Sequence, residues 1–436
     1  MKKLVSLLLA LVLVLALTPA IASEEPIVLK FWHIRGNGAQ YDCVLQAVNS
    51  FNETVGKEKG IVVEENFIGD YVNLFAQVQL AVQSNESPNI VGIAGAHMPY
   101  MLDDGLVVNM APLAEAEGYN LIDNQLPALL EIGGNTDGDM YSVGYCRSTP
   151  LFYYNKGITR EAGIEFGDMV TMDEIKEWGE KVVQKDENGN TTRYAFLRFN
   201  DFAYCHVNHI YQLGSTYLAE DGSGSPCLED GTMLKVLTDW RDSIDAGWCM
   251  PFAANNPSDV AFSMFGSGDL VGCVASCAGL STFRQIAEEE GIELGIAMYP
   301  TYDLNNHRAT IGGASLCIIG AENSEEEIMA SWEFIKHTLA DEQTYYNSSN
   351  SSYIPTTVSI TEYEPMLKFW EETPAYRLAY DQMLEYGHCE ELPSLPFAQD
   401  FTQIVWDACS LLIAEQSITP EEAVEMIKTE SEDLWI

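Results

Sequence analysis

Apolar positions near the start of the chain alternate between two spacings. Ile27 to Trp32 is an apolar run of strand length, and residues 37–51 carry apolar side chains at helical spacing. The alternation then repeats, because residues 61–67 and 89–94 have strand composition and Tyr71 opens a second helical stripe. Strands that alternate with helices predict an α/β unit with a parallel, doubly wound sheet.

The loops after these strands carry residue types that suit ligand binding. In a doubly wound sheet, ligands collect at the carboxyl ends of the strands. Here those ends lead into loops that hold His33, Tyr71 and His97. Trp32, at the end of the first strand, is either a core residue or a platform for a ligand, and the pattern leaves both readings open.

A crossing between two units is predicted at residues 147–156. Leu151 to Tyr154 has the apolar and aromatic composition of a buried strand, and Pro150 forces the residue before it to be extended. A first set of strand and helix patterns ends here and a second set begins. Ser148 and Thr149, at the mouth of this strand, either contact a ligand or satisfy nearby backbone groups.

The second unit repeats the alternation of strands and helices. Residues 193–199, 270–275 and 292–299 have strand composition, and Thr171 with Glu174 predicts the capping box of a helix. Ser276 follows the second of these strands directly, as His33 follows the first strand of the chain. The second unit is therefore expected to be another α/β layer with its own ligand-facing edge.

The chain then returns to the first unit. Residues 311–319 read as a strand in which Gly312 and Gly313 permit close approach of the backbone to a ligand, and a helix capped by Ser324 and Glu327 follows. A chain that crosses, builds a second unit and crosses back predicts two Rossmann-like α/β lobes joined by a hinge, with the ligand between them. We assign residues 25–147 with 298–336 to the first lobe and residues 148–297 with 337–436 to the second.

The amino-terminal segment has the pattern of a secretory signal peptide. Lys2 and Lys3 precede an apolar run from Leu4 to Leu17, and residues 20–22 form an A-x-A cleavage site. We therefore expect residues 1–22 to be removed after Ala22 and the mature protein to be exported, to the periplasm or the outer face of the cell membrane. Cys43 is the first cysteine, so a lipid anchor at the cleavage site is not indicated.

The charge and the cysteine content narrow the classes of partner. The chain has 65 acidic and 22 basic side chains, a net charge of −43, which makes nucleic acids and anionic membrane surfaces poor partners. Ten cysteines in an exported chain could form disulfides, but their wide and irregular spacing is not that of a small disulfide scaffold. Several are expected to be buried apolar residues.

An ordered set of short motifs resembles a known family, the bacterial extracellular solute-binding proteins, family 1, of ABC sugar importers. The resemblance covers nearly all of the chain after the signal peptide. The motifs are Lys30-Phe31-Trp32-His33, Gly69-Asp70-Tyr71, Ser148-Thr149-Pro150 with Tyr153-Tyr154-Asn155-Lys156, Phe265-x-x-Gly268-Asp269, Ile311-Gly312-Gly313-Ala314-Ser315-Leu316, and Tyr353-Ile354-Pro355-Thr356.

The resemblance implies a hinged two-lobed binder of the periplasmic type II class that delivers a small molecule to a membrane permease. The sequence is most similar to the branch that binds glycerol 3-phosphate and glycerophosphodiesters. By position, that branch's ligand contacts fall on Tyr71, Ser148, Ser276, Gly312 or Gly313, and Tyr353, and the family also places contacts near His97. We expect a monomer that uses no cofactor.

Two contacts of that branch are missing from this sequence. Its acidic residue after the third strand falls near Gly95, and Leu395-Pro396-Phe397 is not followed by the arginine that would hold a phosphate. Burying a phosphate dianion without a charged partner is very costly. The ligand is therefore predicted to be a neutral carbohydrate, a mono- or oligosaccharide, and a glycerol 3-phosphate or glycerophosphodiester ligand is the alternative.

Other chemistries have weaker support in the sequence. His206 and His209 lie at helical spacing, and Cys273 and Cys277 frame a strand end, but no third metal ligand is evident beside either pair, so no metal site is predicted. No G-x-S-x-G elbow or H-E-x-x-H helix occurs, and we expect the protein not to be an enzyme. A secreted glycosidase that uses two carboxylates is the alternative from another class.

Overall fold

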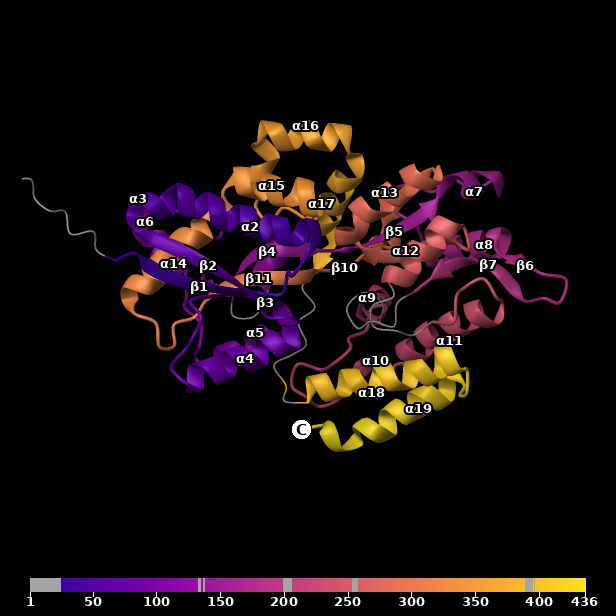
Figure 1. Ribbon diagram of the computed structural model, residues 1–436. Coiled ribbons are helices and arrows are strands. Elements are labelled where there is room, and N and C mark those ends of the chain that lie inside the picture. Colours follow the sequence, from indigo (N-terminus) through magenta and orange to yellow (C-terminus); the bar gives the residue numbers. More distant parts are fainter. Residues whose placement is uncertain are drawn as a thin grey trace, which may run out of the picture.

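A computed structural model gives the fold. It describes residues 25–131, 135, 138–198, 206–252, 258–388, 395 and 397–436. The predicted signal peptide and the motif residue Pro396 lie outside the described residues. Two five-stranded sheets, each flanked by helices, form two lobes that lie side by side in Figure 1. The prediction of two α/β lobes is confirmed.

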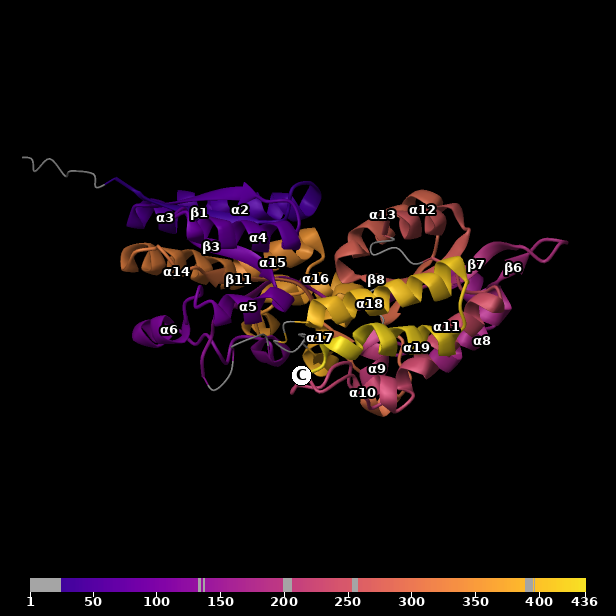
Figure 2. The same cartoon turned by 90° about the horizontal axis from the view of Figure 1, so that it is seen from below.

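The first lobe contains the sheet with strand order β2-β1-β3-β11-β4. Helices α2, α4 and α14 pack beside it in Figures 1 and 2. Its elements are β1 (Ile27–His33), α2 (Gly38–Glu53), α3 (Val55–Lys59), β2 (Ile61–Phe67), α4 (Tyr71–Gln83), β3 (Ile90–Ala94), η1 (Gly95–His97), α5 (Met98–Asp103), α6 (Ala111–Glu117), η2 (Pro127–Glu131), β4 (Val143–Ser148), β11 (Gly312–Ile318), α14 (Glu325–Leu339) and α15 (Asp341–Ser351).

The second lobe contains the sheet with strand order β6-β7-β8-β5-β9. Its elements are β5 (Pro150–Asn155), α7 (Lys156–Glu161), α8 (Met172–Val182), β6 (Gln184–Lys185), β7 (Thr191–Leu197), α9 (Asn208–Gln212), α10 (Pro226–Glu229), α11 (Thr232–Asp245), α12 (Ser258–Ser267), β8 (Leu270–Ser276), η4 (Cys277–Gly279), α13 (Leu280–Glu290), β9 (Leu294–Met298), α18 (Ala398–Ser410), the π-helical turn η7 (Leu411–Glu415) and α19 (Pro420–Ser431).

The elements between β9 and β11 and those between α15 and α18 join the lobes. The segment between β9 and β11 holds β10, which pairs with β12 just after α17. The joining elements are η5 (Leu304–Asn306), β10 (Ala309–Thr310), η6 (Ser359–Glu362), α16 (Glu364–Glu372), α17 (Pro374–Tyr386) and β12 (Gly387–His388).

The sheets are not purely parallel, which corrects the expectation from the alternating pattern. β11 is antiparallel to both of its neighbours, β3 and β4, and β5 is antiparallel to β8 and β9. Both exceptional strands enter their sheet from the other lobe. Such a strand starts at the edge where the local βα strands end, so it must run in the opposite direction. The crossings therefore explain these two exceptions. A third strand, β6, is antiparallel to β7 because a short turn joins the two strands.

The contacts of the residues after 337 favour a last boundary between the lobes other than the predicted one. The sequence assigned residues from 337 onward to the second lobe, but α15 packs against α2 and the Cys43 thiol contacts the Asn347 carbonyl at 3.9 Å. Residues 356–359 also bond to the first lobe, since Thr356 Oγ1 donates to the Gly144 carbonyl at 3.0 Å. We propose that the first lobe extends to about residue 359.

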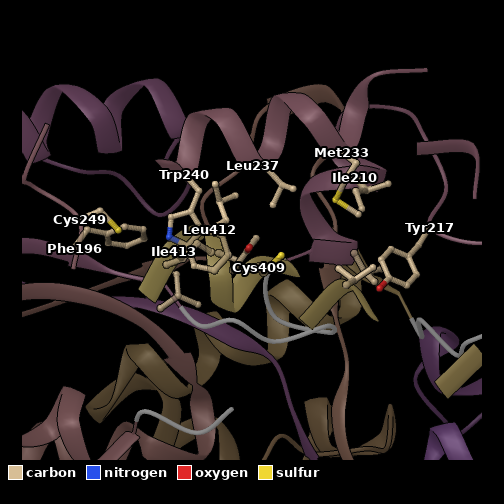
Figure 3. Packing of buried hydrophobic residues seen from close by; sticks show 14 of the residues in the cluster. Phe196, Ile210, Tyr217, Met233, Leu237, Trp240, Cys249, Cys409, Leu412 and Ile413 are labelled. Atoms are coloured by element: carbon tan, nitrogen blue, oxygen red, sulfur yellow. The ribbon is translucent and has the colours of Figure 1, made fainter. Parts of the chain in front are cut away.

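The core of the second lobe explains why the carboxyl-terminal helices belong there. Met233, Leu237 and Trp240 of α11 face Cys409 of α18 and Leu412 of the turn that follows, as Figure 3 shows. Figure 2 shows α18 and α19 lying across this lobe. Apolar faces at helical spacing gain free energy by excluding water, so the amphipathic pattern at the end of the chain is satisfied by this contact.

Local predictions of helix ends are confirmed. The capping boxes of Thr171 with Glu174 and of Ser324 with Glu327 are both formed. Across the residues that the structure describes, no helix is both long and apolar enough to cross a membrane. Eight of the ten cysteines are described; all eight are buried, and no disulfide joins any two of them.

Candidate ligand-binding site

The predicted contact residues gather where the two sheets meet. Ser148 ends β4, Pro150 begins β5, and Thr149 is the single residue between them. Ser276, at the end of β8, pairs with Pro150, and the Cys277 amide donates to the Thr149 carbonyl at 2.9 Å. The carboxyl ends of strands in both lobes therefore face one another across this crossing, where ligands of open α/β sheets bind.

Two predicted tyrosines enclose an arginine that the sequence analysis did not assign to the site. Arg35, in the loop after β1, donates from Nη2 to the Tyr71 hydroxyl at 3.0 Å. Its Cζ lies 5.8 Å from the centroid of the Tyr71 ring and 5.0 Å from that of the Tyr353 ring. Guanidinium groups are attracted to aromatic faces at such distances. Tyr353 is only 4% exposed, so it serves partly as a core residue.

The second lobe approaches this cluster directly. The Ser281 amide at the start of α13 donates to the Ser352 hydroxyl, next to Tyr353, at 3.3 Å. Ala278 of η4 packs against the apolar cluster of the first lobe that contains Tyr353. The Arg35 cluster therefore belongs to the junction between the lobes.

A second arginine, Arg147, lies in the strand that leads to the crossing. Arg147, at the penultimate position of β4, is 1% exposed and donates to the Ser315 hydroxyl. Burial raises the pKa of the Tyr71 hydroxyl, and Arg35 and Arg147 both act to lower it. Burial also raises the pKa of the Cys146 thiol, against which the same two arginines act. Two guanidinium charges therefore act on one small region.

The charge of Arg35 is retained in this environment. Burial acts to lower the pKa of its guanidinium, but Tyr71, Tyr353 and Cys146 outweigh burial and the pKa is raised. An arginine is in any case charged at all physiological pH values. A fixed positive charge thus faces the crossing between the lobes.

The paired glycines lie beside Ser148. Gly312 pairs with Ser148 and Gly313 with Arg147, and the register shifts between Gly313 and Ser315. Gly313 has φ +95°, and a Cβ atom at this position would collide with the Cys146 carbonyl oxygen. The glycine is required there because the two backbones approach closely at an irregular point of the sheet.

His97 and Trp32 lie near this edge but do not join the arginine cluster. The His97 ring stacks on Phe75 of α4, with centroids 4.8 Å apart. Burial lowers the pKa of His97, and its Nδ1 atom has no hydrogen-bond partner among the described residues. Trp32 is partly buried and packs against an apolar cluster that draws residues from both lobes. Both residues are therefore held by packing.

His33 has a local role instead. Its Nε2 atom lies 2.8 Å from Glu65 of β2, whose other oxygen accepts from Tyr41 at 2.8 Å. The ring Nδ1 atom accepts from the Arg35 amide at 3.1 Å. His33 therefore fixes the path of the loop that carries Arg35.

In the histidine pair His206 and His209, the ring of His209 contacts other protein groups. His209 accepts from Arg198 at 2.8 Å and lies 2.9 Å from the Tyr299 hydroxyl, and burial lowers the pKa of His206 to about 3. Within the described ranges, no cluster of three potential metal ligands occurs. A hollow of about 540 Å³ lies elsewhere, beside α6, and includes none of the predicted contact residues.

Arg35 carried no local signal in the sequence, because an arginine in a Gly-rich loop is usually a solvated charge. A signal was nevertheless available. With 22 basic side chains in the whole protein, an arginine that follows the first strand by two positions falls in the loop where ligands collect.

Comparison with known proteins agrees with the observed architecture. The chain is 24% identical over 393 residues to the sn-glycerol-3-phosphate-binding periplasmic protein UgpB of Rhizobium meliloti, which covers 87% of this chain and 88% of that protein. A similar protein from Yersinia pestis is 24% identical over 417 residues, 91% of this chain and 87% of the relative.

Solved structures share the fold. UgpB from Mycobacterium tuberculosis in complex with glycerophosphocholine superposes with a TM-score of 0.77 at 21% identity, covering 94% of this chain and 98% of that one. The sugar-binding protein MalE from Xanthomonas citri superposes with a TM-score of 0.75 at 18% identity, covering 93% and 97%.

A family model described as bacterial extracellular solute-binding protein matches residues 46–377, most of the chain. The match includes both crossings. It also includes Arg147, and Tyr71 and Tyr353, which lie around Arg35. The chain belongs to the bacterial extracellular solute-binding protein family.

Proposed function

We propose that this protein is the exported substrate-binding component of an ABC importer, which captures a carbohydrate between its lobes and delivers it to a membrane permease. The observation that carries the proposal is the meeting of strand ends from both sheets at Thr149. A ligand held there contacts both lobes only when they are closed, and differential contact is what lets a ligand shift a conformational equilibrium.

The proposed ligand contacts come from both lobes. Tyr71, Arg35 and Tyr353 lie in the first lobe, and Ser276 in the second. Aromatic faces suit the C–H surface of a sugar ring, and hydroxyls suit its polar edge. Ser148, Gly312 and Gly313 would form the floor, while Trp32 and His97 would line the edge beside α4.

A ligand screen tests the proposal. The purified mature protein is heated with mono- and oligosaccharides, polyols and glycerophosphodiesters, and binding confined to the folded form raises the unfolding temperature. We expect stabilisation by one class of carbohydrate. Stabilisation by glycerophosphodiesters alone would instead favour the second candidate, which the UgpB relatives support by name.

The same preparation tests the enzyme alternative. Incubation with oligosaccharides should return them unchanged and bound in a one-to-one complex. Release of shorter sugars would establish a secreted glycosidase instead, whose two carboxylates would then be sought by substitution.

The proposal also covers the cleavage site, the location and the oligomeric state of the protein. We propose cleavage after Ala22, retention at the periplasmic or outer face of the membrane, and a monomeric state without cofactor. Mass spectrometry of the protein recovered outside the cytoplasm should give a chain that begins at Ser23. Size-exclusion chromatography with light scattering should give the mass of one chain.

A further inference from the structure

We infer that the ligand carries an anionic group, a carboxylate or a phosphate ester, and that Arg35 binds this group. The inference rests on the proposed function and specifies the chemistry of the same site. It assigns to Arg35 a role in specificity that the resemblance does not assign.

The contacts of Arg35 leave most of its donors uncommitted. A guanidinium has five N–H donors. Among the described residues, the Arg35 side chain contacts the Tyr71 hydroxyl and ring, the Tyr353 ring and the Cys146 thiol. All of these are neutral groups. The side chain is partly exposed, so its remaining donors can meet a ligand.

Within the described part of the chain, no carboxylate pairs with Arg35. On the adjacent strand, Glu65 is bound to His33 and Tyr41 instead. A charge that is partly withdrawn from water is less stable without an opposite charge nearby, and proteins normally provide a partner. The geometry therefore leaves the counter-charge to the ligand.

The local charge is opposite to that of the whole molecule. The chain carries a net charge of −43 with 22 basic side chains, yet Arg147 directly follows Cys146, and Arg35 contacts the Cys146 thiol and the Tyr71 hydroxyl. An acidic surface repels anions at long range, so two guanidinium groups at the junction form a local exception. Such an exception favours an anion that fits this region over anions in general.

The form of Arg35 suits carboxylate and phosphate alike. The planar guanidinium presents parallel N–H donors that match two oxygens of either group. The rings of Tyr71 and Tyr353 restrict its orientation, and a side chain already held in place loses less entropy when it binds.

Matched pairs of neutral and acidic probes test the inference by calorimetry. The pairs are glucose with glucuronate, maltotriose with an acidic trisaccharide of galacturonate, and glycerol with glycerol 3-phosphate. We expect the acidic member of at least one pair to bind about tenfold or more tightly than its neutral partner. The sugar acids and the phosphate ester separate the two sources of the anion.

Substitution identifies the residue. Arg35→Gln should remove the preference, so that the acidic and the neutral member of the pair bind with similar affinity, while Arg35→Lys should retain part of the preference because the charge remains. Arg284→Gln is the control, since Arg284 also lies over a tyrosine ring, 5.8 Å from the Tyr376 centroid, but is exposed on α13. Circular dichroism and urea unfolding establish that each variant is folded.

The outcomes separate this inference from the proposed function. Tight binding of neutral sugars with no gain for the acids overturns the inference and leaves the carbohydrate proposal standing. An acidic preference that survives in folded Arg35→Gln also overturns it. Binding of glycerol 3-phosphate alone, lost in Arg35→Gln, supports the role of Arg35 and replaces the carbohydrate by a phosphorylated polyol.

Discussion

Gly313 shows how strongly one residue at the junction is constrained. It combines φ +95° with a Cβ direction that points at the Cys146 carbonyl oxygen. The first property costs any other residue roughly 1–2 kcal/mol. The second adds a collision with backbone, which cannot move aside without disturbing the pairing of β4 and β11.

We predict that Gly313→Ala lowers the free energy of unfolding by about 3 kcal/mol or more. Gly118→Ala is the matched control, because Gly118 has φ +68° and nothing lies within 4 Å of the place that a Cβ atom would take. The control should lose only about 1 kcal/mol. Urea unfolding measures both variants, and equal losses would show that the collision is relieved by local movement.

His307 couples stability to pH. The residue is 6% exposed, its ring packs edge-on against Tyr386 at 4.7 Å, and burial lowers its pKa to about 4. A histidine that is neutral in the folded protein stabilises it above the unfolded pKa of about 6.5, and this contribution is lost as pH falls toward the folded pKa. The affected window therefore runs from the unfolded pKa down to about 4.

We predict that wild type loses about 2 kcal/mol more than His307→Phe between about pH 7 and pH 4.5, at about 1.4 kcal/mol per pH unit. Phenylalanine keeps the ring contact with Tyr386 but cannot take up a proton. The comparison uses urea unfolding at the two pH values, and parallel losses in wild type and His307→Phe would refute the assignment.

At the scale of elements, the sequence predicts features that depend on neighbouring residues. It does not predict features that depend on tertiary contacts. The capping boxes at Thr171 and Ser324 depend on residues three positions apart, so the sequence contains the whole interaction. The antiparallel direction of β11 depends on where the crossing enters, which no short window records. Arg35 meets Tyr353 through the fold alone, so the charge of the site could not be predicted from spacing.

One side chain of α17 connects the two crossing segments. Gln382 is fully buried and donates to the Thr149 hydroxyl and to the Pro150 carbonyl, both at 2.7 Å. Its carbonyl oxygen accepts from the Tyr299 amide at 2.7 Å. The first crossing and the start of the second are therefore bonded to the same amide group.

We predict that Gln382→Met lowers the free energy of unfolding by about 3 kcal/mol or more, because it leaves the Tyr299 amide and the Pro150 carbonyl buried without partners. Gln343→Met in α15 is the control, a buried glutamine for which no bond to its side-chain oxygen is formed within the described residues. It should lose less than about 1 kcal/mol. A similar loss in both variants would mean that the crossing bonds contribute little.

At the scale of the whole molecule, two lobes joined by extended segments are expected to close on their ligand. Only the closed form makes both sets of contacts, so bound ligand should favour it. Small-angle scattering should then show a smaller radius of gyration with the ligand from the screen than without it. An unchanged radius at saturation would show that the lobes are already closed or do not move.

Alkylation of the buried cysteines should report when the folded chain opens. Burial raises the pKa of Cys43, Cys227 and Cys277 to about 12 each, so only roughly one thiol in 10⁵ is ionised at neutral pH. The thiolate is the nucleophile, and alkylating reagents should therefore reach the eight described cysteines only when the chain opens. The rate of alkylation under native conditions then reports how often the chain opens around each cysteine, and mass spectrometry measures this rate for each cysteine separately. If the lobes unfold independently, Cys43 of the first lobe and Cys227 of the second should be alkylated at different rates. If the lobes unfold together, the two rates should be equal.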